Sequence, residues 1–169
     1  MPLLAAILLR SAASALLTVV EQTMHTRHRP PPGVRHLEVP DRLIAAREAL
    51  SDTNAVAHWR KAGEAVTHEE AKLAVERVHT AGHLQEVQRM SQRGGGFDTD
   101  TYCAPGSWDA MLDGTSAWLE ATALAGQGAG PALALCRPAG HHATADVAMG
   151  FGLVNFAAAA VLNHLETHP

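Results

Sequence analysis

The stretch PALALCRPAGHH, residues 131–142, joins a continuous apolar run to two adjacent histidines. The run Pro131–Cys136 is short and is bounded by a glycine and a proline, which is typical of a fully buried strand in a parallel sheet. Consecutive side chains on a strand point to opposite faces, whereas in a loop just past a strand both can face one pocket. Because open α/β sheets place ligand sites beyond the carboxyl ends of their strands, we expect His141 and His142 to face such a site.

A glycine-rich turn and a second apolar segment follow the two histidines. Gly140 allows close approach of the backbone just before the pair. The sequence GFG at residues 150–152 precedes an apolar stretch that predicts a helix over about 153–165. The chain holds eleven histidines, so adjacency by chance is the alternative explanation of the pair. The order of strand, histidine loop, glycine turn and helix favours a site that carries chemistry.

The rest of the chain is organised by helical patterns and turn residues. In chain order these predict a loop over 25–36, a helix over 40–50, irregular chain over 51–66, a helix opened by the capping box Thr67–Glu70, a flexible loop over 94–96 and a helix from a Ser107 cap to about 125. Long helices that alternate with a buried strand predict a three-layer α/β fold.

A pair of histidines on a predicted helix is a second candidate site. His79 and His83 are four residues apart, in a segment that either continues the helix opened at Thr67 or starts a second helix after Gly82. On one helix this spacing would put both rings on one face, where they could bind a metal. No acidic residue of a His-Glu-x-x-His pattern lies between them, so a structural role is the favoured interpretation.

Length and composition restrict the class of protein. A chain of 169 residues suits one domain, and 47% hydrophobic residues suffice for a packed core, which must be built from Ala, Leu and Val because only 4% are aromatic. The net charge of −4 and the lack of a basic run argue against direct nucleic-acid binding. Two cysteines, Cys103 and Cys136, make no disulfide framework, so we expect a reducing compartment, cytoplasmic or nuclear.

The segment 1–24 is atypical and leaves several interpretations open. Its apolar run is split by Arg10, so neither half reaches the length of a membrane span, and no membrane attachment is expected. A secretory signal would carry positive charge ahead of the apolar core. A folded helix or strand is the favoured interpretation, and organellar targeting or a replaced first strand are the alternatives.

Three sequence elements together resemble the zinc-dependent histone deacetylases and their relatives, the acetylpolyamine amidohydrolases and acetoin-utilisation proteins. RPAGHH with GFGLVNF is similar to the family's RPPGHH and GFCxxNN, and departs from it at Ala139, Gly152 and Phe156. HLEVPDRL at 36–43 is similar to HPExPxRL, and FDTDTY at 97–102 looks like the family's DxDT loop. The resemblance covers residues 36–169 and implies the arginase–deacetylase fold, with residues 25–169 as its N-terminal half.

The resemblance also implies a role for each matching position. His142 is then the general base and acid of amide hydrolysis, and His141 is the imidazole paired with it. The other implied roles are substrate binding by Asp100, with Asp98 as its competitor, a tunnel wall and backbone contact from Phe151 and Gly150, and an acetate product channel at Arg42. For Arg42 a solvated charge at a helix start is the alternative interpretation.

In the family the zinc ligands lie downstream of the histidine pair, starting in an Asp-x-Asp-x-His segment. This sequence stops at Pro169 before such a segment, so we expect the Zn²⁺ of the full-length family but no metal ligand in this chain. The implied function is deacetylation of acetyl-lysine in histones or other proteins, or of small acetylated amines, with this chain a truncated and inactive portion. The alternative is a short non-catalytic paralogue that acts as a binding or scaffold module, and homo-oligomer and corepressor partners stay open.

Overall fold

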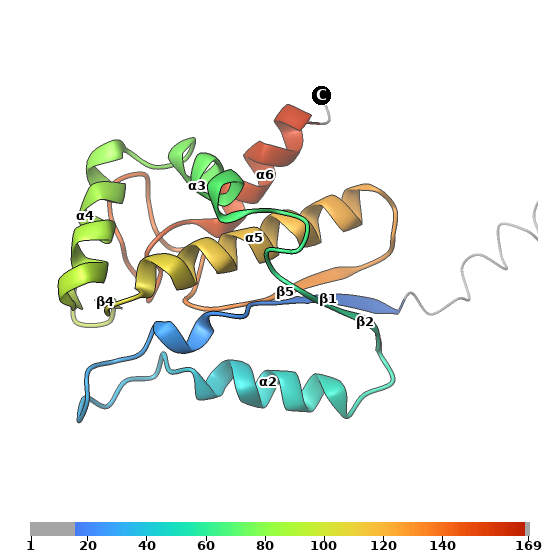
Figure 1. Cartoon of the computed structure of the whole chain (residues 1–169), viewed down its shortest axis with the longest axis horizontal. Coiled ribbons are helices and arrows are strands. Elements are labelled where there is room, and N and C mark those ends of the chain that lie inside the picture. The colour runs from blue at the N-terminus through green and yellow to red at the C-terminus, as the bar shows by residue number, and fades with distance from the viewer. Residues whose placement is uncertain (1–15, 168–169) are drawn as a thin grey trace, which may run out of the picture.

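Three parallel strands form the middle layer of the computed structural model, which describes residues 16–167 (Figure 1). Strand β1 (Leu17–Glu21) lies between β2 (Val56–Lys61) and β5 (Ala132–Leu135) and is parallel to both. Val19 pairs with one residue on each side of β1 and is fully buried. The β-branched residues of β1 suit this central position, because their side chains pack on both faces of the sheet.

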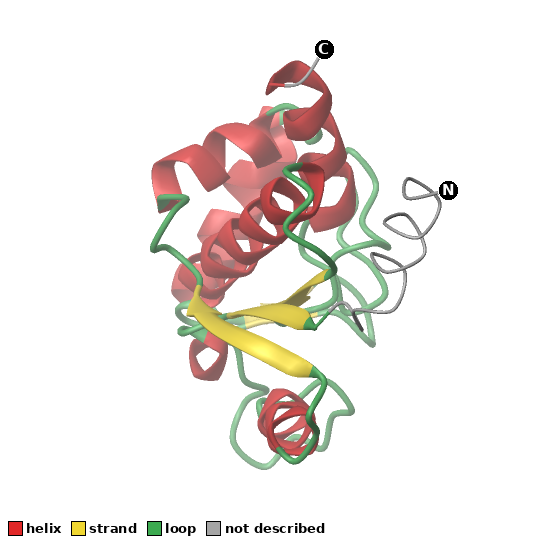
Figure 2. Cartoon of the chain, turned by 90° about the vertical axis from the view of Figure 1, so that its right-hand side faces the viewer, coloured by secondary structure: helices red, strands yellow, loops and turns green. Residues whose placement is uncertain are grey.

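Helices cover both faces of this sheet (Figure 2). Helix α2 lies on one face, and helices α3, α5 and α6 lie on the opposite face. The helices are α2 (Asp41–Ser51), α3 (His68–Glu76), α4 (Ala81–Arg93), α5 (Ser107–Gly126) and α6 (Phe156–Thr167), with a short 3-10 helix η1 (His25–Arg27) after β1. The three-layer α/β fold predicted from the sequence is therefore confirmed.

The atypical amino-terminal segment contributes the central strand. Residues 17–21 of the segment 1–24 form β1, so a strand is the correct interpretation for this part. The segment boundary at residue 24 falls between β1 and η1. Targeting or any other role of residues 1–15 concerns residues outside the described part of the chain.

Two segments predicted to be irregular contain strands. Residues 51–66 include β2, whose side chains are mostly exposed because it lies at the edge of the described sheet, so no apolar alternation marks it in the sequence. The glycine loop at 94–96 includes β3 (Gly95–Gly96), which pairs with β4 (Tyr102–Cys103) in a short antiparallel hairpin. Backbone pairing rather than side-chain pattern creates both strands.

Strand β5 confirms the predicted parallel strand but is only half-buried. Its one neighbour among the described residues is β1, so its other edge and part of its side-chain surface are uncovered. The expectation of a fully buried strand is wrong for this reason.

Capping side chains decide where the helices begin. The Thr67 hydroxyl accepts from the Glu70 amide at 3.3 Å, and the Glu70 carboxylate accepts from the Thr67 amide at 2.8 Å, which confirms the capping box of α3. The Thr80 hydroxyl accepts from the His83 amide at 3.3 Å and caps α4, so α4 is a separate helix. The predicted Ser107 cap is wrong, because Gly106 is the cap of α5 and Ser107 is its first residue.

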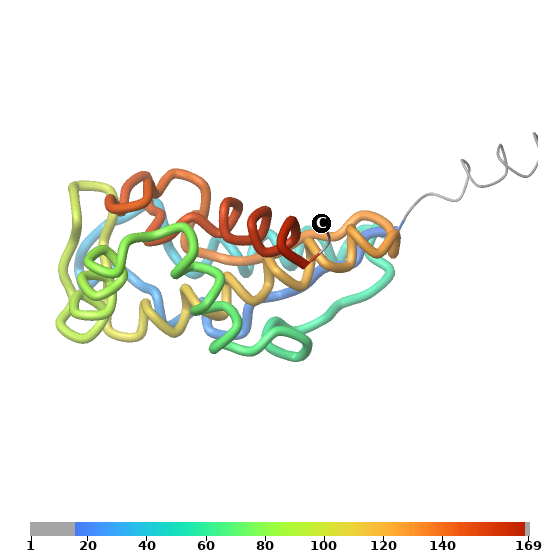
Figure 3. Tube along the Cα trace, turned by 90° about the horizontal axis from the view of Figure 1, so that it is seen from above, coloured from blue at the N-terminus to red at the C-terminus, as the bar shows by residue number. Residues whose placement is uncertain are grey.

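Helix α5 is the central helix of the larger helical layer and contacts α3, α4 and α6. It crosses the sheet, and α6 lies alongside it (Figure 3). The buried side chains between α5 and its neighbours are mostly aliphatic, as the composition predicts; they include Val75, Met111, Leu112, Leu119, Val154 and Phe156. This packing fixes the start of α6, which lies beside the histidine loop.

Candidate active site

The predicted histidine pair lies in the loop after β5, exposed to solvent. The ring centroids of His141 and His142 are 4.1 Å apart and the rings are tilted by 41°. Gly150 lies against His142, since a Cβ at position 150 would be 2.7 Å from the Cγ of His142. Gly150 also has φ of 57°, a backbone conformation that favours glycine. A side chain at position 150 would therefore be strained and would collide with His142.

The start of α6 holds both flanks of the histidine pair. The Gly140 carbonyl accepts from the Ala157 amide at 3.1 Å, and the Ala143 carbonyl accepts from the Asn155 side-chain amide at 3.0 Å. Asn155 also caps α6 by accepting from the Ala158 amide at 2.9 Å. The role of Asn155 was not predicted, and its position just before an apolar helix is the signal that points to it.

Phe156, one of the departures from the family pattern, fills the space beneath this loop. Its ring is fully buried, and a Cβ at Gly140 would lie 2.0 Å from its Cδ2 atom. The close approach predicted for Gly140 is therefore a contact with Phe156. An aromatic ring at this position contributes packing under the histidine loop.

The predicted tunnel residue Phe151 is held in the left-handed backbone region, with φ of 68°. Such a conformation costs about 1 kcal/mol or more for a residue other than glycine and is common at functional sites. The Phe151 amide donates to the Thr101 hydroxyl at 3.2 Å, and the ring of His36 meets the Phe151 ring edge-on at 5.4 Å. Thr101 thereby links Phe151 to the aspartate loop.

The two candidate rim aspartates differ in their local roles. Asp98 accepts from the backbone amide of Asp100 at 2.8 Å, which is an ordinary turn contact. Asp100 follows in the same loop with an exposed side chain. Asp100 is the better placed of the two to accept a hydrogen bond from a ligand, and its role in substrate binding stays a prediction.

Arg42 lies in the first turn of α2, next to a cavity. It is paired with Glu38, four residues earlier, and its side chain is 57% exposed. Arg42 and Glu38 line a cavity of about 210 Å³ together with Leu43, Ala46, Leu135, Cys136, Arg137 and Ala139. Leu135, Cys136 and Arg137 place the cavity at the carboxyl end of β5, and its use as a product channel stays a prediction.

Arg137 forms a buried polar centre that sequence analysis missed. It is 4% exposed, and its guanidinium donates to the Glu38 carboxylate at 2.8 Å, to the Tyr102 hydroxyl at 3.0 Å and to the carbonyls of His25, at 2.6 Å, and His28. The signals in the sequence were a charged residue directly after an apolar strand and its place in the RPAGHH stretch, neither of which names its partners. Such donors must all be satisfied when buried.

Aromatic rings close this polar centre on one side. His28 stacks on Tyr102 with ring centroids 4.3 Å apart, and its Nδ1 is hydrogen-bonded to the Ser107 hydroxyl at 2.7 Å. Burial lowers the pKa of His28 to about 3, and the positive charge of Arg137 adds to this effect. Burial also raises the pKa of Tyr102 to about 12. Both rings therefore stay neutral near pH 7.

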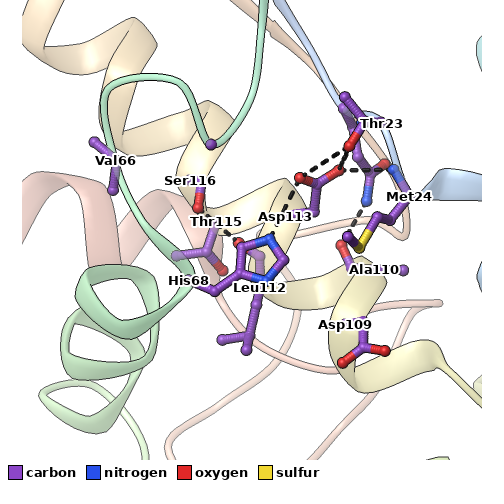
Figure 4. Close-up of polar contacts among 12 residues, drawn as sticks. Thr23, Met24, Val66, His68, Asp109, Ala110, Leu112, Asp113, Thr115 and Ser116 are labelled. Carbon is purple, nitrogen blue, oxygen red and sulfur yellow. Dashed lines mark hydrogen bonds and ion pairs between the residues drawn. The ribbon is translucent and has the colours of Figure 1, made fainter.

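The carbonyls of His25 and His28 follow a segment that Asp113 of α5 binds through hydrogen bonds (Figure 4). The Asp113 carboxylate accepts from the backbone amides of Thr23 at 2.6 Å and Met24 at 2.7 Å. His68 contacts the other carboxylate oxygen at 3.4 Å. This anchor fixes the exit of β1 and hence the start of η1 above Arg137.

A zinc site does not fit the residues that the structure describes. A catalytic zinc takes about three protein ligands, and between residues 16 and 167 no group of three or more His, Cys, Asp or Glu side chains could hold a metal ion. His79 and His83 bond to the loop backbone through their Nε2 atoms, at Asn155 N and Leu153 O, so they serve the structural role favoured above.

The sequence model of the histone deacetylase domain matches residues 36–168. The chain belongs to the histone deacetylase family. The solved HD domain of HDA15 superposes with a TM-score of 0.75 at 28% identity, over 90% of this chain and 44% of that one. The parallel sheet between helix layers is thus the family fold, present here in part.

A deacetylase and an acetylpolyamine amidohydrolase are among the curated relatives. A probable deacetylase of Methanothermobacter thermautotrophicus is 40% identical over 86 residues, which cover 50% of this chain and 25% of that protein. Acetylpolyamine amidohydrolase 1 of Pseudomonas aeruginosa is 40% identical over 70 residues, covering 41% and 20% respectively. The chain spans less than half the length of the curated relatives it matches. Within residues 16–167, no helix is both long and apolar enough to span a membrane.

Proposed function

We propose that this chain supplies the proton-transfer half of a deacetylase active site. The observation that carries the proposal is the exposed His141–His142 pair, held at both flanks by α6 and packed against Gly150. Amide hydrolysis needs a group that takes a proton from water and returns it to the leaving amine. His142, which contacts Gly150, is the general base and acid in this proposal, and His141 is its charge-tuning neighbour.

The adjacent rings explain why a pair can serve this task. Their centroids are 4.1 Å apart, so both rings are close enough to act at the same bound amide. Zinc is a family property, and between residues 16 and 167 no group of three or more His, Cys, Asp or Glu side chains could hold it, so in this proposal the chain contributes the histidine pair and no zinc ligand.

Substrate binding is assigned to the residues beside the pair. Phe151 forms the wall of a narrow acyl pocket, the Gly150 backbone contacts the substrate, and Asp100 accepts hydrogen bonds from a peptide backbone at the rim. The candidate substrates of this proposal are acetyl-lysine in a protein and a small acetylated amine. Acetate leaves by way of the cavity beside Arg42.

The first test is whether a longer product exists and depends on His142. Transcripts should be sequenced past the codon for Pro169, and a product with an Asp-x-Asp-x-His segment should be purified and assayed with an acetyl-lysine peptide. His142→Ala should lower its turnover by about 10²–10⁴-fold and leave its zinc content near that of the unmodified protein. Loss of zinc in step with activity would show that the pair is wrongly assigned.

The rim assignment is tested by comparing two substrates in the same product. Asp100→Ala should weaken hydrolysis of an acetylated peptide more than that of acetylputrescine, because the proposed partner of Asp100 is a peptide backbone. Asp98→Ala is the matched variant in the same loop. Equal losses on both substrates would reject the role of Asp100.

A non-catalytic binding module is the second candidate function. The lack of a metal ligand set between residues 16 and 167 favours it. A stop codon directly after Pro169, no turnover, and acetyl-peptide binding that survives His142→Ala would together establish this alternative.

A further inference from the structure

His79 occupies the junction between α3 and α4 and is 7% exposed. Its Nε2 atom lies 2.9 Å from the Asn155 backbone amide, which can only donate. Nε2 must therefore be unprotonated, and the ring proton belongs on Nδ1, which lies 3.3 Å from the Ala145 carbonyl. The hydrogen bonds thus select one tautomer of a neutral ring.

Asn155 carries this constraint to the histidine pair. Its side-chain NH₂ donates to the carbonyl of Ala143, the residue next to His142. Its side-chain oxygen caps α6 at Ala158. The position of Asn155 is thus set by His79 through the backbone and by α6 through the cap, and it determines where the chain leaves His142.

We propose that His79, as the neutral Nδ1–H tautomer, and Asn155 form a positioning pair that sets the orientation of His141 and His142. His79 is a positioning residue and acts through Asn155. That the positioned rings transfer protons rests on the proposed function, whereas the positioning itself does not. Protonation of Nε2 would remove the acceptor of the Asn155 amide and free the histidine loop.

The surroundings keep His79 neutral near pH 7. Burial lowers the pKa of His79, and the adjacent His83 of α4, with ring centroids 4.9 Å apart, lowers it further. Lys72 and Glu76 of α3 line the same cavity of about 350 Å³ and are paired with each other at 3.0 Å. On the loop side, Asp146 is the charged residue next to Ala145, whose carbonyl faces His79.

The primary test is imidazole nitrogen NMR on the 169-residue chain, with assigned signals for His79, His141 and His142. His79 should show the Nδ1–H pattern near pH 7. As the pH falls below 6.5, the signals of the pair should show an inflection at the pH where His79 titrates. An Nε2–H pattern at His79, or a pair that ignores its titration, would overturn the proposal.

Two substitutions of His79 separate positioning from bulk. In His79→Gln the side-chain oxygen can accept from the Asn155 amide and the NH₂ can donate to the Ala145 carbonyl, without titrating. The signals of the pair should then resemble the unmodified protein and lose the extra inflection. His79→Leu should shift them at every pH, and His58→Gln on the exposed face of β2 is the control for losing a histidine. A His79→Gln spectrum that keeps the inflection would contradict the proposal.

If His79→Leu does not fold, a substitution of Asn155 provides a second test of the positioning role. Asn155→Asp keeps an oxygen that caps α6, and it replaces the NH₂ donor to Ala143 by an acceptor oxygen and a negative charge. The thermal transition should stay close to that of the unmodified chain, while the signals of the pair shift. In a longer active product kcat should fall by up to about 10²-fold at similar KM. Unchanged signals would overturn the positioning role, whatever the activity proves to be.

Discussion

Arg137 and the His141–His142 pair are neighbours in one loop, yet their surroundings are opposite. Arg137 is 4% exposed and donates to a carboxylate, a hydroxyl and two carbonyls. The two histidines are exposed and face each other. The buried polar centre of Arg137 and its partners, which we call the floor, is thus extensively hydrogen-bonded, whereas the two histidines further along the loop face solvent.

The physical reason lies in what each group must do. A buried guanidinium is stable only when all its donors are bonded, so its position is fixed by several distant segments at once. A group that transfers protons must change its protonation state, which an exposed and loosely solvated ring allows. We therefore expect the free energy of unfolding to depend mainly on Arg137 and its buried partners. The proposed activity should depend mainly on His141 and His142.

Arg137→Met should produce the largest loss of stability. The substitution leaves Glu38, which is 2% exposed, without its buried partner, and a broken buried ion pair typically costs about 3–5 kcal/mol. Urea denaturation measures the free energy of unfolding. Arg47→Met is the matched control, because Arg47 pairs with Glu21 at a 49% exposed position, where about 0–1 kcal/mol is expected. Similar losses in both variants would contradict the special position of Arg137.

His28, which stacks on Tyr102 beside Arg137, should also make the free energy of unfolding depend on pH. Unfolded His28 takes up a proton near pH 6.5, whereas the folded ring resists it until about pH 3, so stability falls as the pH drops through this range. One proton contributes at most about 1.4 kcal/mol per pH unit. Burial also lowers the pKa values of His25 and His79, which act in the same direction.

The contribution of His28 to this pH dependence is measured by comparing the unmodified protein with His28→Phe. His28→Phe keeps an aromatic ring against Tyr102 and cannot titrate. Denaturation of both proteins between pH 7 and pH 4 should show a shallower pH dependence for His28→Phe. Equal slopes would mean that His28 is not held neutral by the fold.

His142→Ala should have the smallest effect on stability. Its ring is exposed, and surface substitutions usually change the free energy of unfolding by less than about 0.5 kcal/mol. The same urea titration used for Arg137→Met measures it. A loss above about 1.5 kcal/mol would mean that the pair belongs to the stabilising floor, and the comparison between the two regions would fail.

Local signals were sufficient for several elements. Thr67 and Glu70 predict the start of α3 because a capping box needs only residues three positions apart. The apolar run before His141 predicts β5, since a short apolar segment between glycine and proline has few other solutions. The resemblance in residues 36–43, 97–102 and 137–156 predicted the family and the fold, and the family match and the structure confirm both.

Tertiary structure alone decided the rest. Arg137 bonds to the His25 carbonyl across 112 positions, and Asn155 meets His79 across 76. The sequence by itself determined most of the helices, the strand β5 and the loop that carries the histidine pair, because capping, periodicity and turn chemistry act over a few residues. Which strand is central, how β2 joins the sheet and which groups support the histidine pair depended on contacts between distant segments, since hydrogen-bond partners there are set by packing and leave no local pattern.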